Sequence, residues 1–94
     1  MIATITQNGN RWELEGDILM DSANQLLEKS KALTLSDSAV IDFSQVAEID
    51  TATVSLMLEW RRRALGEKKQ LSFINFPEGL TSLAALYGVA DLIN

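Results

Sequence analysis

The chain has 94 residues, a formal charge of −5, and neither cysteine nor histidine. This length predicts one domain over residues 1–94, and the acidic balance disfavours contact with nucleic-acid phosphates and anionic lipid headgroups. Disulfides and thiol chemistry are excluded, and the commonest general base and metal ligand are missing, so we expect no enzyme activity, metal site or cofactor.

The N-terminal segment predicts a β-hairpin. Residues 2–6 are rich in β-branched side chains with a weak strand periodicity, and apolar and polar side chains alternate over 11–15. Asn8-Gly9-Asn10 between them is a turn signal. Gly16 is expected to end the second strand. Residues 1–7 lack the basic start and apolar stretch of a signal peptide, and no apolar run is long enough to insert in a membrane. We therefore expect a cytoplasmic location.

A first helix and a buried strand are predicted next. Asp21 and Ser22 are residue types that cap a helix, and apolar residues then recur at helical spacing for about three turns. The nearly continuous apolar run 39–43 predicts a strand covered by other elements. Residues 44–50 are expected to form a loop.

A second helix, a strand and a third helix complete the order. The second helix is expected from Thr51 to about residue 65, with Asp50 or Thr51 as its N-cap and Gly66 as its stop. A strand over 69–76 ends at Pro77, a helix covers roughly 78–87, and the tail 89–94 should dock on the core. The order β-β-α-β-α-β-α predicts an α/β fold, a mixed β-sheet with an N-terminal hairpin and helices packed against it.

One stretch carries more information than the rest. Residues 40–54 read as two apolar residues, Asp, an apolar residue and Ser, then Val, then an apolar residue, Asp and Thr at the start of a helix. This resembles the signature of STAS domains, the family of sulfate-transporter tails and bacterial anti-sigma-factor antagonists. The matching positions are Asp42, Ser44, Val46, Asp50, Thr51 and Val54. The element order agrees with the STAS fold along nearly the whole chain.

Within that family, the chain is similar to the small STAS subunits of bacterial phospholipid ABC transporters. The short length, the Asp50-Thr51 pair and the ending over 82–89 carry this resemblance. It implies a non-catalytic subunit that binds the transporter's cytoplasmic ATPase, with the permease in the same complex. Its role would be to support or regulate a transporter that maintains outer-membrane lipid asymmetry. The subunit would lie at the inner membrane only through its partner.

The alternative is an anti-sigma-factor antagonist. In such proteins the hydroxyl residue after the Asp is phosphorylated by a partner kinase, and Thr51 occupies that position. Read from the residues alone, Asp50 and Thr51 are helix caps worth about 1 kcal/mol. Ala52 and Thr53 stand where the switching proteins have Ser and Gly, and the added Cβ of Thr53 is expected to hinder the approach of a kinase.

Two further features have a plain interpretation and a functional one. Asp42 either caps the following loop, which we favour, or helps Asp50 to form a small-molecule pocket at the strand ends. Arg61, Arg62 and Arg63, followed by Lys68 and Lys69, either form a solvated basic helix end, which we favour, or a local basic patch for nucleic acid.

The second helix is more apolar than one buried stripe requires. Val54, Leu58 and Leu65 project on one side, with Met57 beside them. A second stripe, formed by Leu56, Trp60 and Ala64, projects on a different side. A helix on a sheet is expected to bury one stripe, so part of the other is a candidate partner face, unless Trp60 packs under the third helix or its ring lies flat on neighbouring side chains. The residues predicted to carry the partner contact are Asp50, Thr51, Thr53, Val54, Leu56 and Trp60.

Overall fold

The computed structural model describes residues 2–89 and 91 and contains the predicted order of strands and helices. The elements are β1 (Thr4–Asn8), β2 (Arg11–Ile18), α1 (Met20–Ser30), β3 (Ser38–Ile49), α2 (Thr51–Gly66), β4 (Gln70–Ile74) and α3 (Leu80–Leu86). Val89 of the predicted C-terminal tail packs against the core, whereas residues 90 and 92–94 of that tail lie outside the described residues.

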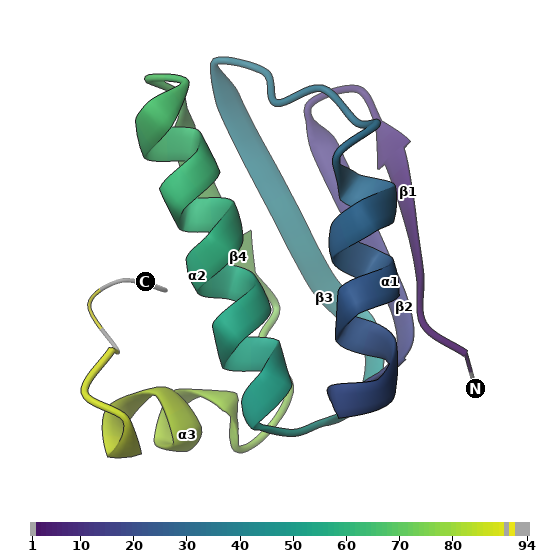
Figure 1. Cartoon of the computed structure of the whole chain (residues 1–94), viewed down its shortest axis with the longest axis vertical. Helices are drawn as coiled ribbons and strands as arrows, with labels where there is room; N and C mark the ends of the chain where they lie inside the picture. The colour runs from purple at the N-terminus through teal and green to yellow at the C-terminus, as the bar shows by residue number, and fades with distance from the viewer. Residues whose placement is uncertain (1, 90, 92–94) are drawn as a thin grey trace.

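The four strands form one mixed sheet in the order β1-β2-β3-β4. β1 pairs antiparallel with β2, and β2, β3 and β4 run parallel. The two parallel connections step across the sheet in the same direction, so a common handedness places α1 and α2 on one face. Both helices begin at the same end of the fold, where the parallel strands finish and where α3 also lies (Figure 1).

The predicted hairpin is confirmed, but its second strand is longer than expected. Gly9 and Asn10 form the turn between the paired residues Asn8 and Arg11, with Gly9 at φ 64°. Gly16 does not end β2. It adopts φ 94° beside an irregularity in the register, and the strand continues to Ile18.

The prediction of a loop over residues 44–50 is wrong, because β3 extends to Ile49. The extension of β2 beyond Gly16 supplies the missing partner, with Gly16 opposite Val46 and Ile18 opposite Ile49. β4 pairs only with the first part of β3, from Ser38 to Asp42. A strand with many polar residues is stable here because its backbone groups are paired along β2.

The core lies between the sheet and the two long helices, and α2 contributes more than one stripe to it. Val54 and Met57 are buried, and so are Leu56, Trp60 and Ala64 from the other predicted stripe. Our expectation that α2 buries one stripe is therefore wrong. The reason is that α2 packs on the sheet while α1 covers its side, so the buried arc is wider than a helix resting on a sheet alone would have.

Two of the three consecutive arginines hold the fold together instead of lying in solvent. Arg63 donates from Nη1 to Ser30 O at 2.8 Å and from Nη2 to Leu33 O at 2.6 Å, at the C-terminal end of α1. Arg61 donates from Nη1 to Leu71 O at 2.6 Å. Carbonyls at a helix end or on an outer strand have free acceptor capacity, and a guanidinium satisfies it well; Ser30 O accepts from Leu33 N–H as well, at 3.0 Å.

The end of α2 differs from the prediction and suggests a stabilising pair of changes. Gly66 lies inside the helix, and the left-handed residue is Lys68, at φ 58°. Lys69 N–H bonds to Ala64 O at 2.8 Å, as in a Schellman cap with Lys68 where glycine is usual. Lys68→Gly is expected to raise the free energy of unfolding by about 1 kcal/mol. Gly66→Ala is expected to add about 0.5 kcal/mol, since its Cβ meets nothing within 4 Å.

Urea unfolding of the two single variants and the pair measures these gains. If Gly66 were the left-handed residue, Gly66→Ala would destabilise the protein instead, and that result would contradict the assignment.

Candidate functional site

Asp50 connects the starts of the two long helices. As the N-cap of α2, it accepts a hydrogen bond from Ala52 N–H at Oδ1, at 2.8 Å. Its Oδ2 accepts from Met20 N–H, the first residue of α1, at 2.9 Å. One carboxylate therefore satisfies unpaired donors at two helix ends, where negative charge is also favoured by the helix dipoles. The predicted N-cap role of Asp50 is confirmed.

Contrary to the prediction, neither Asp21 nor Ser22 is the N-cap of α1, although Ser22 takes part in the cap through a capping box. The N-cap is Leu19, and both predicted residues lie in the first turn. The hydroxyl of Ser22 instead accepts a hydrogen bond from Leu19 N–H at 3.0 Å. The cap that local sequence does not supply to Met20 comes from Asp50, which follows β3.

Replacing Asp50 tests this double cap. Asp50→Ala is expected to lower the free energy of unfolding by about 2 kcal/mol, the sum of two capping contributions of about 1 kcal/mol each. Asp50→Asn keeps one acceptor and is expected to lose about half as much. Chemical denaturation measures both variants. The matched control is Asp21→Asn, an exposed carboxylate in the first turn of α1, where we expect a loss of about 0.5 kcal/mol.

If Asp50→Asn cost as little as Asp21→Asn, the bond to one of the two helices would not contribute to stability.

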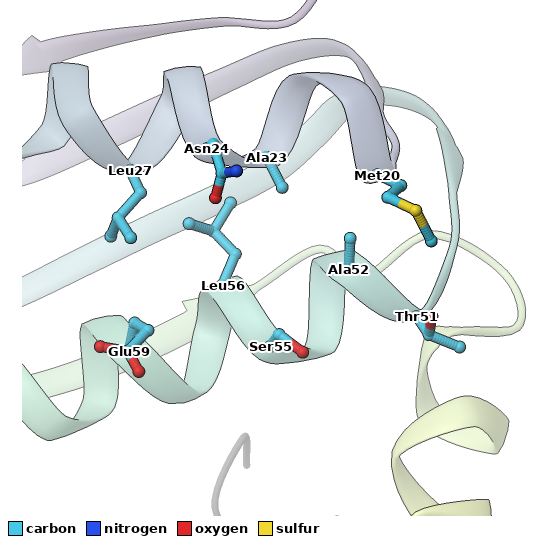
Figure 2. A pocket seen from close by; sticks show the side chains of 9 residues that line it. All are labelled: Met20, Ala23, Asn24, Leu27, Thr51, Ala52, Ser55, Leu56 and Glu59. Atoms are coloured by element: carbon cyan, nitrogen blue, oxygen red, sulfur yellow. The ribbon is translucent and has the colours of Figure 1, made fainter.

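Thr51 and Ser55 form an exposed hydroxyl ridge along the start of α2, with a groove on each side. The first groove, about 330 Å³, runs between α1 and α2. Figure 2 shows Met20, Ala23, Asn24 and Leu27 of α1 facing Thr51, Ala52, Ser55, Leu56 and Glu59 of α2 across it.

The second groove lies on the other side of the ridge, towards the C-terminal segment. It has about 280 Å³ and is lined by the same two hydroxyl residues together with Val54, Leu58, Tyr87 and Val89. Apolar side chains dominate this lining, and Tyr87 is 57% exposed. Met20, at the end of the first groove, is 74% exposed. We call the ridge and its two grooves the helix-start surface.

Only part of the predicted partner-contact set reaches the surface. Thr51 is exposed and Asp50 is half-buried. The other four are largely buried. Leu56 and Val54 still line the walls of the first and second groove, respectively, whereas Thr53 and Trp60 line neither groove and support the site from below. The hypothesis of an exposed Trp60 is therefore wrong. Trp60 is buried, and its ring contacts Trp12 of β2 and hydrogen-bonds to Ser30 of α1, where the alternative had named the third helix as the cover.

Thr53 lies where the switching proteins have glycine, and its side chain points into the fold. Its hydroxyl donates to Ile18 O at 2.8 Å, which joins the start of α2 to the end of β2. The Cβ of Thr53 is thus inside the protein. The expected obstruction of a kinase by this Cβ is not supported, because a partner approaching Thr51 from outside does not meet it.

Sequence reasoning missed Met20, Ser55 and Tyr87, which help to form the helix-start surface. A signal for Ser55 was present, since Thr51 and Ser55 are four residues apart and share a helix face. Met20 and Tyr87 had no such signal, because they come from α1 and from the end of α3 and reach the site only through the fold.

Asp42 belongs to a separate cluster and lines neither groove. It is 5% exposed, and its Oδ1 accepts from Ser44 N–H at 2.8 Å, which confirms the preferred capping role. Asn75 Nδ2 donates to the same oxygen at 2.9 Å, and Arg11 Nη1 to Oδ2 at 3.2 Å. Burial favours a higher pKa for Asp42, but these hydrogen bonds and the charge of Arg11 hold the pKa below its usual value.

Every oxygen of the Asp42 carboxylate is thus occupied by groups of the fold, which argues against a ligand site shared with Asp50. Among residues 2–89 and 91, no cluster of acidic side chains has the grouping of a metal site. No helix in this part of the chain has the length and apolar character needed to span a membrane.

Comparisons with known proteins agree with this architecture. The model of a family described as "Mlab, STAS domain" matches residues 3–94. The solved structure of the anti-sigma factor antagonist SpoIIAA in its unphosphorylated form superposes with a TM-score of 0.74, over 98% of this chain and 85% of that chain, at 13% identity. No curated protein sequence matches.

A second solved structure, of the protein Mglu, has a TM-score of 0.60 at 23% identity. The match covers 80% of this chain but only 19% of Mglu. At these identities, both structural likenesses establish the fold and nothing finer.

Proposed function

This chain belongs to the MlaB-type STAS domains, and on that premise we propose that it is a non-catalytic subunit that binds the cytoplasmic ATPase of a phospholipid ABC transporter. The observation that carries the proposal is the helix-start surface, which offers an exposed hydroxyl ridge between two grooves with apolar walls. Such a surface suits contact with another protein, because apolar side chains fill the grooves while the hydroxyls hydrogen-bond at their rim.

The chemistry of the chain supports a binding role within such a complex. The sequence contains no G-x-x-x-x-G-K-[ST] segment, so a partner must supply nucleotide binding. Thr51 has no histidine or cysteine to activate it as a nucleophile, since neither residue occurs in the chain. In the proposed role the domain supports or regulates the ATPase, lies in the cytoplasm, and meets the inner membrane through the ATPase and its permease.

Affinity purification from the native host tests the proposal. The tagged chain is expected to recover an ABC ATPase and its permease from solubilised membranes, as identified by mass spectrometry. Ser55→Arg places a long charged side chain on the ridge and should reduce the recovered ATPase by about tenfold or more, equivalent to at least 1.4 kcal/mol of binding. Arginine is a good helix former, so the exposed position should tolerate it.

Leu65→Arg is the matched control, because Leu65 is an exposed residue near the C-terminal end of the same helix and lies outside both grooves of the helix-start surface. It adds the same charge and should leave recovery unchanged. Circular dichroism confirms that both variants fold. Equal loss in both variants, or recovery of no ABC ATPase by the unaltered chain, would refute the proposal.

An anti-sigma-factor antagonist is the second candidate, favoured by the exposure of Thr51 at the start of α2 and by the fold shared with SpoIIAA. This role predicts that the purification recovers a soluble kinase instead of a transporter. Incubation with that kinase and ATP would then add a phosphate that Thr51→Ala abolishes, read as a mass shift. Recovery of the transporter alone would remove this candidate.

A further inference from the structure

Positive and negative side chains are segregated along the length of the fold. The chain has eight Lys and Arg residues, and none of them occurs in 12–28, 32–60 or 70–94. Those segments contain the starts of all three helices and the ends of the parallel strands. Because α1 and α2 begin at the same end (Figure 1), the basic residues in their last turns collect at the opposite end.

The end that carries the helix-start surface is acidic and has no basic residue to balance it. Asp21 in the first turn of α1, Glu48 at the end of β3 and Glu78 before α3 are all exposed. None of the three forms an ion pair within the described part of the chain. We call these three residues the acidic frame. Asp50 adds a further negative charge that is committed to the two helix starts.

The opposite end differs, because it carries the basic residues and most of them form ion pairs with acidic residues of the chain. Lys31 lies 2.9 Å from Glu28, Lys69 lies 2.7 Å from Asp37, and Arg63 lies 2.7 Å from Glu67. The formal charge of −5 is therefore concentrated around the helix-start surface. A surface with one sign of charge around apolar grooves attracts ligands of opposite charge and repels phosphates and anionic lipids.

We propose that the occupant of the helix-start surface is a basic amphipathic segment of the partner protein. Its apolar side chains enter the grooves beside Thr51 and Ser55, and its Lys and Arg side chains face Asp21, Glu48 and Glu78. This inference rests on the proposed function for the identity of the partner. The charge argument itself concerns only the chemistry of whatever segment docks there.

A synthetic peptide of about four helical turns, with Leu on one face and Lys on the other, is the probe for the segment. Added to the ¹⁵N-labelled chain, it is expected to shift the amide resonances of Ala23, Thr51, Ser55 and Tyr87. The same peptide with Glu in place of Lys should shift none of them. Raising the ionic strength from about 0.01 M to about 0.15 M should weaken binding markedly, as the Debye length falls from about 30 Å to about 8 Å.

Two sets of substitutions separate the acidic frame from overall charge. The test variant is Asp21→Asn with Glu48→Gln and Glu78→Gln. The control is Asp37→Asn with Glu28→Gln and Glu67→Gln, which has the same composition and formal charge but alters the opposite end. The test variant should weaken peptide binding, and slow association with the recovered ATPase, by about tenfold or more. The control variant should change the peptide affinity and the association rate with the ATPase by less than about twofold each.

Three results would overturn the inference: equal loss of peptide binding in the two variants, equal affinity for the Glu and Lys peptides, or resonance shifts centred on the C-terminal ends of α1 and α2. The outcomes also separate this inference from the proposed function. If no ABC ATPase is recovered but the Lys peptide shifts resonances of the helix-start surface, the transporter role is refuted and the proposal of a basic segment is supported. If the ATPase is recovered but neither salt nor substitution of the acidic frame changes its association rate, the transporter role is supported and the proposal of a basic segment is refuted.

Discussion

Replacing Trp60 with alanine is expected to lower the free energy of unfolding by about 3–5 kcal/mol, as truncation of buried aromatic side chains does. Trp60 is 1% exposed and meets Trp12 edge to face, with 5.9 Å between ring centroids. Its Nε1 donates to Ser30 Oγ at 2.9 Å. A domain of this size has a total stability of roughly 5–14 kcal/mol, so the variant should lose a large share of it.

Urea denaturation monitored by circular dichroism measures this loss of stability. Two further variants serve as controls for burial and for the hydrogen bond of the indole. Leu65→Ala removes a large apolar side chain from the same helix at a position that is 69% exposed, and should change stability by less than about 0.5 kcal/mol. Trp60→Phe keeps an aromatic ring but leaves Ser30 without its donor, at a cost of about 1–2 kcal/mol. Similar losses for Trp60→Ala and Leu65→Ala would place Trp60 at the surface and contradict the fold.

The Trp60 result also decides how partner binding is tested. A charged residue at position 60 would enter the core beside Trp12 and unfold the domain, so loss of binding in such a variant would say nothing about an interface. Ser55 and Leu65 are suitable positions because both are exposed on α2.

Replacing Gly16 with alanine is expected to cost about 2–4 kcal/mol. Gly16 has φ 94°, which costs a residue with a Cβ about 1–3 kcal/mol. A Cβ built there lies 2.7 Å from Ile2 O and 3.1 Å from Ala3 Cα, so the N-terminal segment must shift away from β2. Crowding of this kind adds about 1–3 kcal/mol, reduced where the neighbouring backbone relaxes.

Gly9→Ala is the control that separates the two contributions. Gly9 also has a positive φ, 64°, but a Cβ there meets nothing within 4 Å. Its loss should be about 1 kcal/mol, from the backbone conformation alone. Calorimetric or chemical unfolding of both variants measures the difference. If Gly16→Ala lowered the free energy of unfolding no more than Gly9→Ala, the close approach of residues 2–3 to β2 would not contribute to the cost of the substitution.

The sequence by itself determined the order of the elements, the family, the hairpin turn and the start of α2. These features depend on neighbouring residues: Gly9 supplies the positive φ of the turn, and Asp50 accepts from an amide two residues later. Local backbone chemistry of this kind is present in the sequence before any tertiary contact forms.

Only the tertiary structure decided which residues are inside and which groups pair over long distances along the chain. Trp60 is buried because α1 brings Ser30 to its indole from 30 residues away. Residues 44–49 form a strand because β2 continues beyond Gly16, and Asp50 caps α1 as well as α2 because β3 ends beside Met20. A helix-spaced pattern reports which residues are apolar, but burial depends on the elements that pack around the helix, and no local pattern encodes them.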